Sequence, residues 1–106
     1  MKYFYNYPDD LSELSSYEEC AVLVKAVQPT HYRFIIRFFK NGKDHREEGP
    51  SYIDVLASKD LHIFKNFTHK AWFLEGKLLF SSEALKEWGI KEPHTLNDIK
   101  KICCLL

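Results

Sequence analysis

Four consecutive ionisable residues, His45-Arg46-Glu47-Glu48, form the densest group of chemically capable side chains in the sequence. An imidazole beside carboxylates is a combination that can perform general acid–base catalysis. The same side chains can instead hold a turn in place, through side-chain-to-backbone bonds and a local ion pair. We favour this structural role. If the turn also has a function, we expect it to be contact with a partner, since exposed turns between rigid strands are common binding sites.

Other catalytic or metal-binding patterns do not occur. No C-x-x-C and no helical H-x-x-x-H pair exists, and the nucleotide-binding and G-x-S-x-G fingerprints are missing. Cys20 lies on the apolar face of an expected helix, where we expect core packing and not nucleophilic catalysis. We therefore predict a protein that is not an enzyme and needs no cofactor or metal. The histidines are scattered at positions 31, 45, 62, 69 and 94.

Cysteine content and hydropathy predict a cytoplasmic protein. The three cysteines form an odd set without framework spacing, and neighbouring Cys103 and Cys104 could bridge each other only with strain. Asp9 and Asp10 interrupt the start before a signal-peptide core could form, and no apolar run reaches the roughly 18 residues of a membrane span. The last four residues fit a C-a-a-X lipidation pattern, although we expect them to continue a helix.

The charge is zero overall but unevenly distributed. Residues 1–30 hold two lysines against five carboxylates, a net charge of −3, and the remainder holds thirteen basic against ten acidic residues, a net charge of +3. Zero net charge excludes a generic polyanion-binding protein, because no long-range field would attract one. An acidic leading segment on a weakly basic body could still orient a partner.

At the N-terminal end, the elements expected are a short strand and a helix. Alternating tyrosines at positions 3, 5 and 7 suggest a short strand that ends at Pro8. The S-x-x-E pattern of Ser16 and Glu19 resembles a capping box, and apolar residues at helical spacing follow it. We predict a helix over residues 17–27.

The alternating pattern of residues 32–39 predicts the clearest strand, with the side chains at positions 32, 34, 36 and 38 on one buried face. Asn41-Gly42 predicts a turn, and further extended runs cover residues 51–55, 61–64, 71–74 and 78–80, with turns at 58–60 and 75–77. Two short helices should follow: one over residues 83–88, capped by Ser81 or Ser82 and stopped by Gly89, and one after Thr95. The predicted fold is a single α+β domain over residues 1–106, with an antiparallel sheet of about five strands, an N-terminal helix and two C-terminal helices.

Two segments repeat the same pattern 34 residues apart. Residues 38–43 (FFKNGK) and 72–77 (WFLEGK) each contain an aromatic pair, a spacer, a turn residue, glycine and lysine. Such a cassette predicts a β-hairpin in which glycine adopts a positive φ. Two copies are fewer than a solenoid needs.

The run Asn41-Gly42-Lys43-Asp44-His45-Arg46-Glu47-Glu48-Gly49-Pro50, followed by Trp72-Phe73-Leu74-Glu75-Gly76-Lys77-Leu78, resembles the MORN-like hairpin repeats of bacterial antitoxin and toxin-immunity proteins. The resemblance covers about residues 38–79, within a hairpin-rich core at about residues 31–80. Glu48 replaces the usual aspartate, Ser51 the usual alanine, and Leu79 a histidine. These departures suggest one domain with one and a half cassettes.

The resemblance implies a protein of contact-dependent growth inhibition, which neutralises a cognate toxin domain, expected to be a nuclease, by covering its active site. Carboxylates could mimic phosphates for a basic nuclease cleft. The partner-binding residues that we expect are Asp9, Asp10, Glu13, Glu18, Glu19, His45, Arg46, Glu47 and Glu48.

Two alternative functions remain open. The first is a small phage or regulatory adaptor that binds a host protein. The second, a weaker alternative, is an RNA-binding sheet, because Arg33, Arg37 and Lys40 stand beside strand aromatics. The expectation that those aromatics form the core argues against it.

Overall fold

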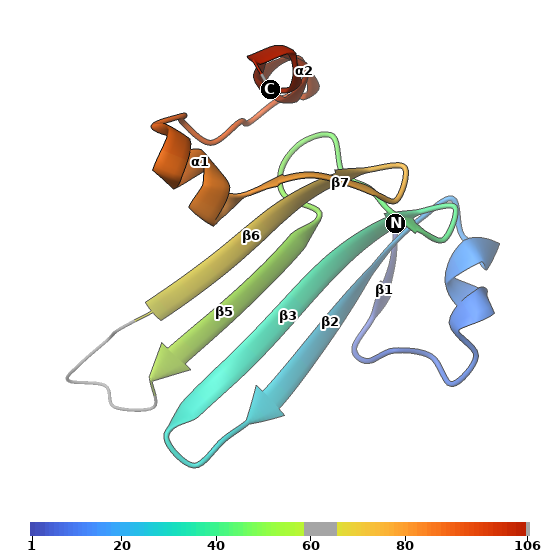
Figure 1. Ribbon diagram of the computed structural model, residues 1–106. Helices are drawn as coiled ribbons and strands as arrows, with labels where there is room; N and C mark the ends of the chain where they lie inside the picture. The colour runs from blue at the N-terminus through green and yellow to red at the C-terminus, as the bar shows by residue number, and fades with distance from the viewer. Residues whose placement is uncertain (59–65, 106) are drawn as a thin grey trace.

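The computed structural model describes residues 1–58 and 66–105, in which seven strands form one mixed, mostly antiparallel sheet (Figure 1). The order across the sheet is β1-β2-β3-β5-β6-β7, with β4 paired to the end of β3. β1 runs parallel to β2, and the other described pairs are antiparallel. The strands are β1 (Lys2–Phe4), β2 (Glu19–Val27), β3 (His31–Lys40), β4 (Lys43–Asp44), β5 (Tyr52–Ser58), β6 (Asn66–Leu74) and β7 (Lys77–Ser81).

Three short helices accompany the sheet: a 3-10 helix, η1 (Leu11–Ser16), and two α-helices, α1 (Ser82–Trp88) and α2 (Leu96–Leu105). The α+β class and both C-terminal helices are confirmed, but the sheet has more strands than the five expected. The strand expected over residues 61–64, with most of the turn before it, lies outside the described residues. None of the described helices has the length and apolar character needed to cross a membrane.

The helix predicted over residues 17–27 is wrong, because Glu19–Val27 forms strand β2. Ser16 ends η1 and caps no α-helix. The β-branched run within residues 21–24 favours extended backbone. All nine residues of β2 pair with β3, from Glu19 opposite Lys40 to Val27 opposite Tyr32. This ladder gives alternate residues of β2 hydrogen-bond partners on β3, so tertiary pairing overrides the local helical pattern.

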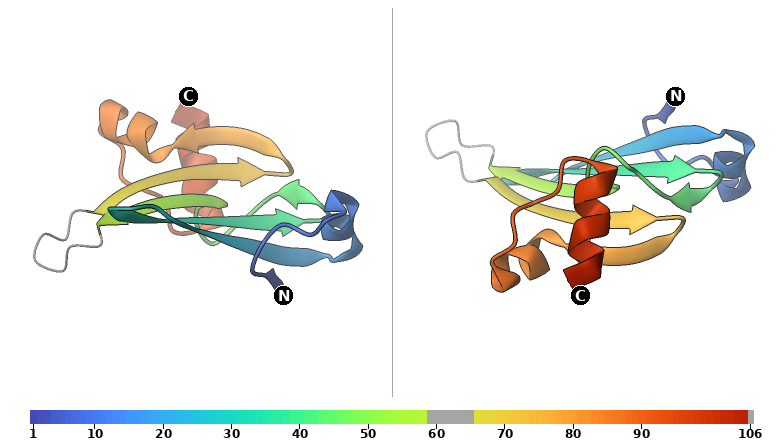
Figure 2. Two further views of the ribbon diagram at one scale, coloured as in Figure 1. Left: turned by 90° about the horizontal axis from the view of Figure 1, so that it is seen from below. Right: turned by 90° about the horizontal axis from the view of Figure 1, so that it is seen from above.

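Each face of the sheet carries its own hydrophobic cluster. On one face, which we call the opposite face, Leu14 of η1 packs on Cys20, Val22 and Phe39. On the other, which we call the helix face, α1 and α2 cover Trp72 and Phe80 (Figure 2). The helix residues in this second cluster are Leu85, Ile99 and Ile102.

Local capping explains both C-terminal helices. The Ser81 hydroxyl accepts the N–H of Ala84 at 3.3 Å, and Gly89 ends α1 with a φ of 71°. The Thr95 hydroxyl accepts the N–H of Asp98 at 3.2 Å, which starts α2. These are the caps that the sequence predicts.

The assignment of β3 faces needs a correction. We expected the even-numbered residues of β3 to form the core, but its fully buried side chain is Phe39, on the opposite face. Phe34, Ile36 and Phe38 lie on the helix face and are only half-buried. The reason is the position of the two helices. The sheet residues that α1 and α2 cover belong to β6 and β7, so the part of this face formed by β2 and β3 stays partly open.

Ser51 connects β3 to β6 at the point where the ladder becomes irregular. Its side chain is fully buried, its C=O accepts the N–H of Phe38 at 2.8 Å, and its N–H donates to the C=O of Ala71 at 3.0 Å. The β6–β7 register shifts between Trp72 and Phe73, and the Ser51 hydroxyl accepts the N–H of Phe73 at 2.9 Å. Ser51 therefore supplies a hydrogen-bond acceptor to an irregular part of the strand.

Ser51→Ala should lower the free energy of unfolding by about 1–3 kcal/mol, because the half-buried N–H of Phe73 loses its partner. Urea unfolding followed by circular dichroism measures this loss. Ser15→Ala removes an exposed hydroxyl and should cost less than about 0.5 kcal/mol. Equal stability of Ser51→Ala and the unaltered protein would show that the Ser51 hydroxyl does not support the strand.

Candidate functional site

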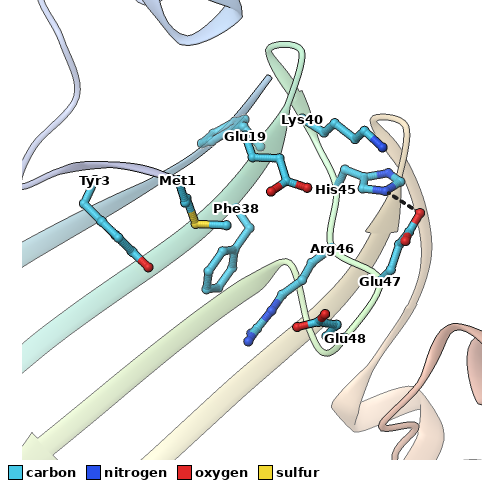
Figure 3. A pocket seen from close by; sticks show the side chains of 10 residues that line it. Met1, Tyr3, Glu19, Phe38, Lys40, His45, Arg46, Glu47 and Glu48 are labelled. Carbon is cyan, nitrogen blue, oxygen red and sulfur yellow. Dashed lines mark hydrogen bonds and ion pairs between the residues drawn. The ribbon is translucent and has the colours of Figure 1, made fainter. Parts of the chain in front are cut away.

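A pocket of about 290 Å³ opens on the helix face, at the end of the sheet where β3 turns into β4 (Figure 3). Glu19 approaches it from β2, while Glu47 and Glu48 come from the loop that follows β4 (Figure 3). We call it the acidic pocket because it holds these three carboxylates against two basic side chains, Lys40 and Arg46. The residues lining it are Met1, Tyr3, Glu19, Phe38, Phe39, Lys40 and residues 45–48.

Two equivalent turns build this end of the sheet. Asn41 and Gly42 have φ values of 51° and 79°, and Glu75 and Gly76 have φ values of 52° and 81°. Positive φ at both central residues is the geometry of a two-residue type I′ hairpin. The repeated cassettes are therefore confirmed as matching hairpins, β3–β4 and β6–β7.

The two hairpins lie against each other. The N–H of Gly76 donates to the C=O of Asp44 at 2.8 Å, and the N–H of Arg46 donates to the C=O of Phe73 at 3.3 Å. These bonds join the chain after β4 to the β6–β7 hairpin. The loop bearing residues 45–48 is thus held by backbone contacts to a second hairpin.

His45 fastens this loop with its ring. Its side chain is only 10% exposed, and Nδ1 lies 2.9 Å from the N–H of Glu75, which donates to it. Because Nδ1 accepts a hydrogen bond, the proton of the neutral ring lies on Nε2, which is 3.3 Å from the Glu47 carboxylate. His45 therefore positions Glu47 and connects the two hairpins.

Arg46 forms one wall of the acidic pocket. Its guanidinium carbon lies 4.1 Å from the centre of the Phe38 ring, and Nη1 donates to the C=O of Pro50 at 3.2 Å. A Cβ at Gly49 would lie 3.2 Å from Nη1, so glycine gives the guanidinium room. Arg46 therefore shields part of Phe38 and orders the loop beside Glu48.

The carboxylates of the pocket differ in their partners. Glu47 faces His45, whereas Glu19 and Glu48 make no ion pair with any residue in the described ranges 1–58 and 66–105. All three residues are exposed at the mouth of the pocket. Two of the three carboxylates are thus available to pair with an incoming cation.

The structure does not place the other predicted acidic residues in this pocket. Asp9, Asp10, Glu13 and Glu18 are exposed on the segment between β1 and β2. Asp10 caps η1 by accepting the N–H and the hydroxyl of Ser12, and these two bonds lower the pKa of its carboxyl group. Asp10 therefore has a structural role at the start of η1.

The arginines that suggested an RNA-binding sheet are engaged within the protein. Arg33 pairs with Asp54 at 2.6 Å, and Arg37 pairs with Asp44 at 3.0 Å. Both lie on the opposite face, away from the acidic pocket. Both guanidinium groups therefore already have carboxylate partners within the sheet.

Comparison with protein-family models, curated proteins and solved structures gave no match to this chain. The resemblance to MORN-like immunity proteins therefore stays a prediction. Within residues 1–58 and 66–105, no group of three histidine, cysteine or acidic side chains is arranged to hold a metal ion.

Cysteine reactivity tests the placement of Cys20. Burial raises the pKa of its thiol, whereas Cys103 and Cys104 are exposed on α2. A thiol reagent should therefore modify two cysteines in the native protein and the third only after unfolding, because the thiolate is the reactive form. Mass spectrometry of the modified peptides measures this, and prompt modification of Cys20 would contradict its burial under η1.

Proposed function

We propose that this protein is an immunity protein that binds a cognate bacterial toxin domain, a nuclease, and covers its active site. The observation that carries this proposal is the acidic pocket, where Glu19 of β2 meets Glu47 and Glu48 of the hydrogen-bonded loop after β4. A nuclease cleft is basic because its substrate is a polyanion. Carboxylates held in place by the fold can occupy such a cleft with little loss of conformational entropy.

Charge supports a particular mode of association. Glu19 and Glu48 form no ion pair in the described part of the chain, although Lys40 and Arg46 line the same pocket, so both carboxylates are free to pair with a cation of the partner. Complementary charges raise the association rate more than they slow dissociation, and salt screens them. The half-buried ring of Phe38 beside the carboxylates supplies apolar area for the docked complex.

The test looks for a large toxin reading frame next to this gene; the C-terminal domain that such a frame encodes is co-expressed with the chain and then purified for binding kinetics. We expect rescue of growth, a stable complex and an association rate that falls in about 0.5 M salt. The combined variant Glu19→Gln, Glu47→Gln, Glu48→Gln should slow association about tenfold or more.

Two control variants separate this pocket from other acidic surfaces. Glu87→Gln removes an exposed carboxylate of α1 and should leave the association rate unchanged. Glu13→Gln removes an exposed carboxylate of η1 and tests whether the acidic N-terminal segment contributes to the association rate. No complex and no rescue would reject the proposed function, and a salt-independent rate would reject the electrostatic mode of binding.

A further inference from the structure

The outer edge of β2 is only partly paired. β1 pairs with β2 along residues 20–22 and ends there, while β3 pairs with β2 along its whole length on the other side. Beyond Val22, residues 23–27 have no second neighbouring strand among the described residues. Figure 1 shows that β1 runs beside only part of β2, and the rest of β2 forms an edge of the sheet at which outward-pointing backbone groups have no neighbouring strand among the described residues.

The ladder shows which amides point outward. The N–H of Gln28 donates to the C=O of His31 at 2.8 Å, so this residue pair is hydrogen-bonded across the β2–β3 turn. Hydrogen-bonding pairs alternate in an antiparallel ladder, which directs the N–H groups of Val24 and Ala26 toward β3. The N–H and C=O groups of Lys25 and Val27 consequently point away from the sheet.

Apolar surface accompanies this edge on the helix face. A groove of about 340 Å³ lies over the junction of β1, β2 and β3, and its walls include Tyr5, Leu23 and Ile36. Tyr5 is 82% exposed and Val27 is 63% exposed. A strand added beside residues 23–27 would place alternate side chains toward this groove.

Charge identifies the kind of strand that fits. The Lys25 ammonium lies over the rings of Tyr32 and Phe34, 5.2 Å and 5.9 Å from their centres. It forms no ion pair with any carboxylate in the described part of the chain. A cation held on the sheet, next to an open edge, is complementary to a carboxylate on the neighbouring strand.

We propose that residues 23–27 of β2 are a docking edge for an extended segment of a protein partner that carries a carboxylate opposite Lys25. A second copy of the chain fits less well, because the antiparallel register that pairs all five residues sets Lys25 against its own copy. This edge is separate from the acidic pocket and does not depend on the partner being a toxin. Main-chain bonds would hold the segment, and the Lys25 pair would select it.

Two synthetic peptides of about nine residues, the length of a strand, test the proposal. Valine and threonine alternate around a central glutamate in one peptide and around a central lysine in the other. The full chain is mixed with each peptide, and amide hydrogen exchange is followed by NMR. The glutamate peptide should slow exchange at Lys25 and Val27, and bind about two- to fivefold more tightly than the lysine peptide, as a cross-strand charge pair predicts.

Paired variants make the result specific. Lys25→Glu should reverse the preference between the two peptides. Val27→Pro removes an outward N–H and should abolish binding, whereas Val27→Ala keeps this group and should bind. Unfolding measurements serve as the control that both Val27 variants are folded. Lys25→Glu tests the edge independently of the Val27 variants.

Three outcomes would overturn the proposal. One is unchanged exchange at Lys25 and Val27 with either peptide in excess. Another is equal binding by Val27→Pro and Val27→Ala. The third is concentration-dependent protection of these amides without peptide, which would identify a second copy of the chain as the occupant.

Discussion

Trp72→Ala should remove about 3–5 kcal/mol from the free energy of unfolding, the usual cost of truncating a large buried aromatic side chain. Trp72 is 1% exposed and packs against Phe80, with ring centres 5.4 Å apart, below Leu85, Ile99 and Ile102. A domain of this size is stable by about 5–15 kcal/mol, so the variant should be close to unfolding. We expect its Tm to fall by more than about 10 °C in calorimetry.

The second tryptophan provides a matched control. Trp88 is 48% exposed at the end of α1, so Trp88→Ala should change the free energy of unfolding by less than about 0.5 kcal/mol. Trp72→Phe is informative because Nε1 of Trp72 is buried without a hydrogen-bond partner in the described part of the protein. Phenylalanine removes that unpaired donor, and we expect less than about half of the loss seen with alanine. Similar losses for Trp72→Ala and Trp88→Ala would contradict the position of Trp72 in the core.

Gly42→Ala should cost about 2–4 kcal/mol, from backbone strain together with a steric clash. The φ of Gly42 is 79°, where a side chain is unfavourable, and an added Cβ would lie 2.8 Å from the Cβ of Ser15. Because Ser15 belongs to η1, the clash would push η1 away from the β3–β4 turn. Urea unfolding measures the loss of stability.

Gly76→Ala is the control for backbone strain alone. Gly76 has almost the same φ, 81°, but an added Cβ would lie 3.5 Å from the Cβ of Lys43, an ordinary contact. We expect a loss of about 1–2 kcal/mol. The difference between the two variants then measures how tightly η1 packs on the first hairpin, and equal losses would show that η1 moves aside freely.

Local signals predicted much of the fold. Turn and cap residues act through neighbouring backbone groups, so they can be recognised in the sequence. The structure places a turn or a cap at each of those predicted: Asn41-Gly42, Gly76, Ser81, Gly89 and Thr95. The region around Cys20 was predicted wrongly because its apolar spacing also suits a helix, and only the distant pairing with β3 decides for a strand. The alternating tyrosines predicted a short strand near the N-terminus, which the structure places at β1 (Lys2–Phe4), whereas the two residues of β4 are too few to show a periodicity.

The candidate site was predictable only in part. The cluster of residues 45–48 is visible in the sequence, but its association with Glu19 requires the β2–β3 pairing. The bond between His45 and the backbone of Glu75 spans 30 residues. The repeated cassette contained a signal for this bond. Two equivalent hairpins that pack together bring the residue after the first hairpin, His45, to the turn of the second hairpin at Glu75. The only sequence signal for the structural role of Ser51 was that the MORN-like repeats, which this segment resembles, have alanine at the corresponding position.

The two hydrophobic clusters on opposite faces of the sheet have a consequence for cooperativity. They share no residue: one joins η1 to β2 and β3, and the other joins α1 and α2 to β6 and β7. Each can open with a free energy of its own, in the manner of a locally unfolding unit. Ser51 bonds to both β3 and β6 and so couples the two units. Because the two clusters share no residue, detachment of α1 and α2 would leave the contacts of η1 with β2 and β3 in place, and with them the proposed docking edge.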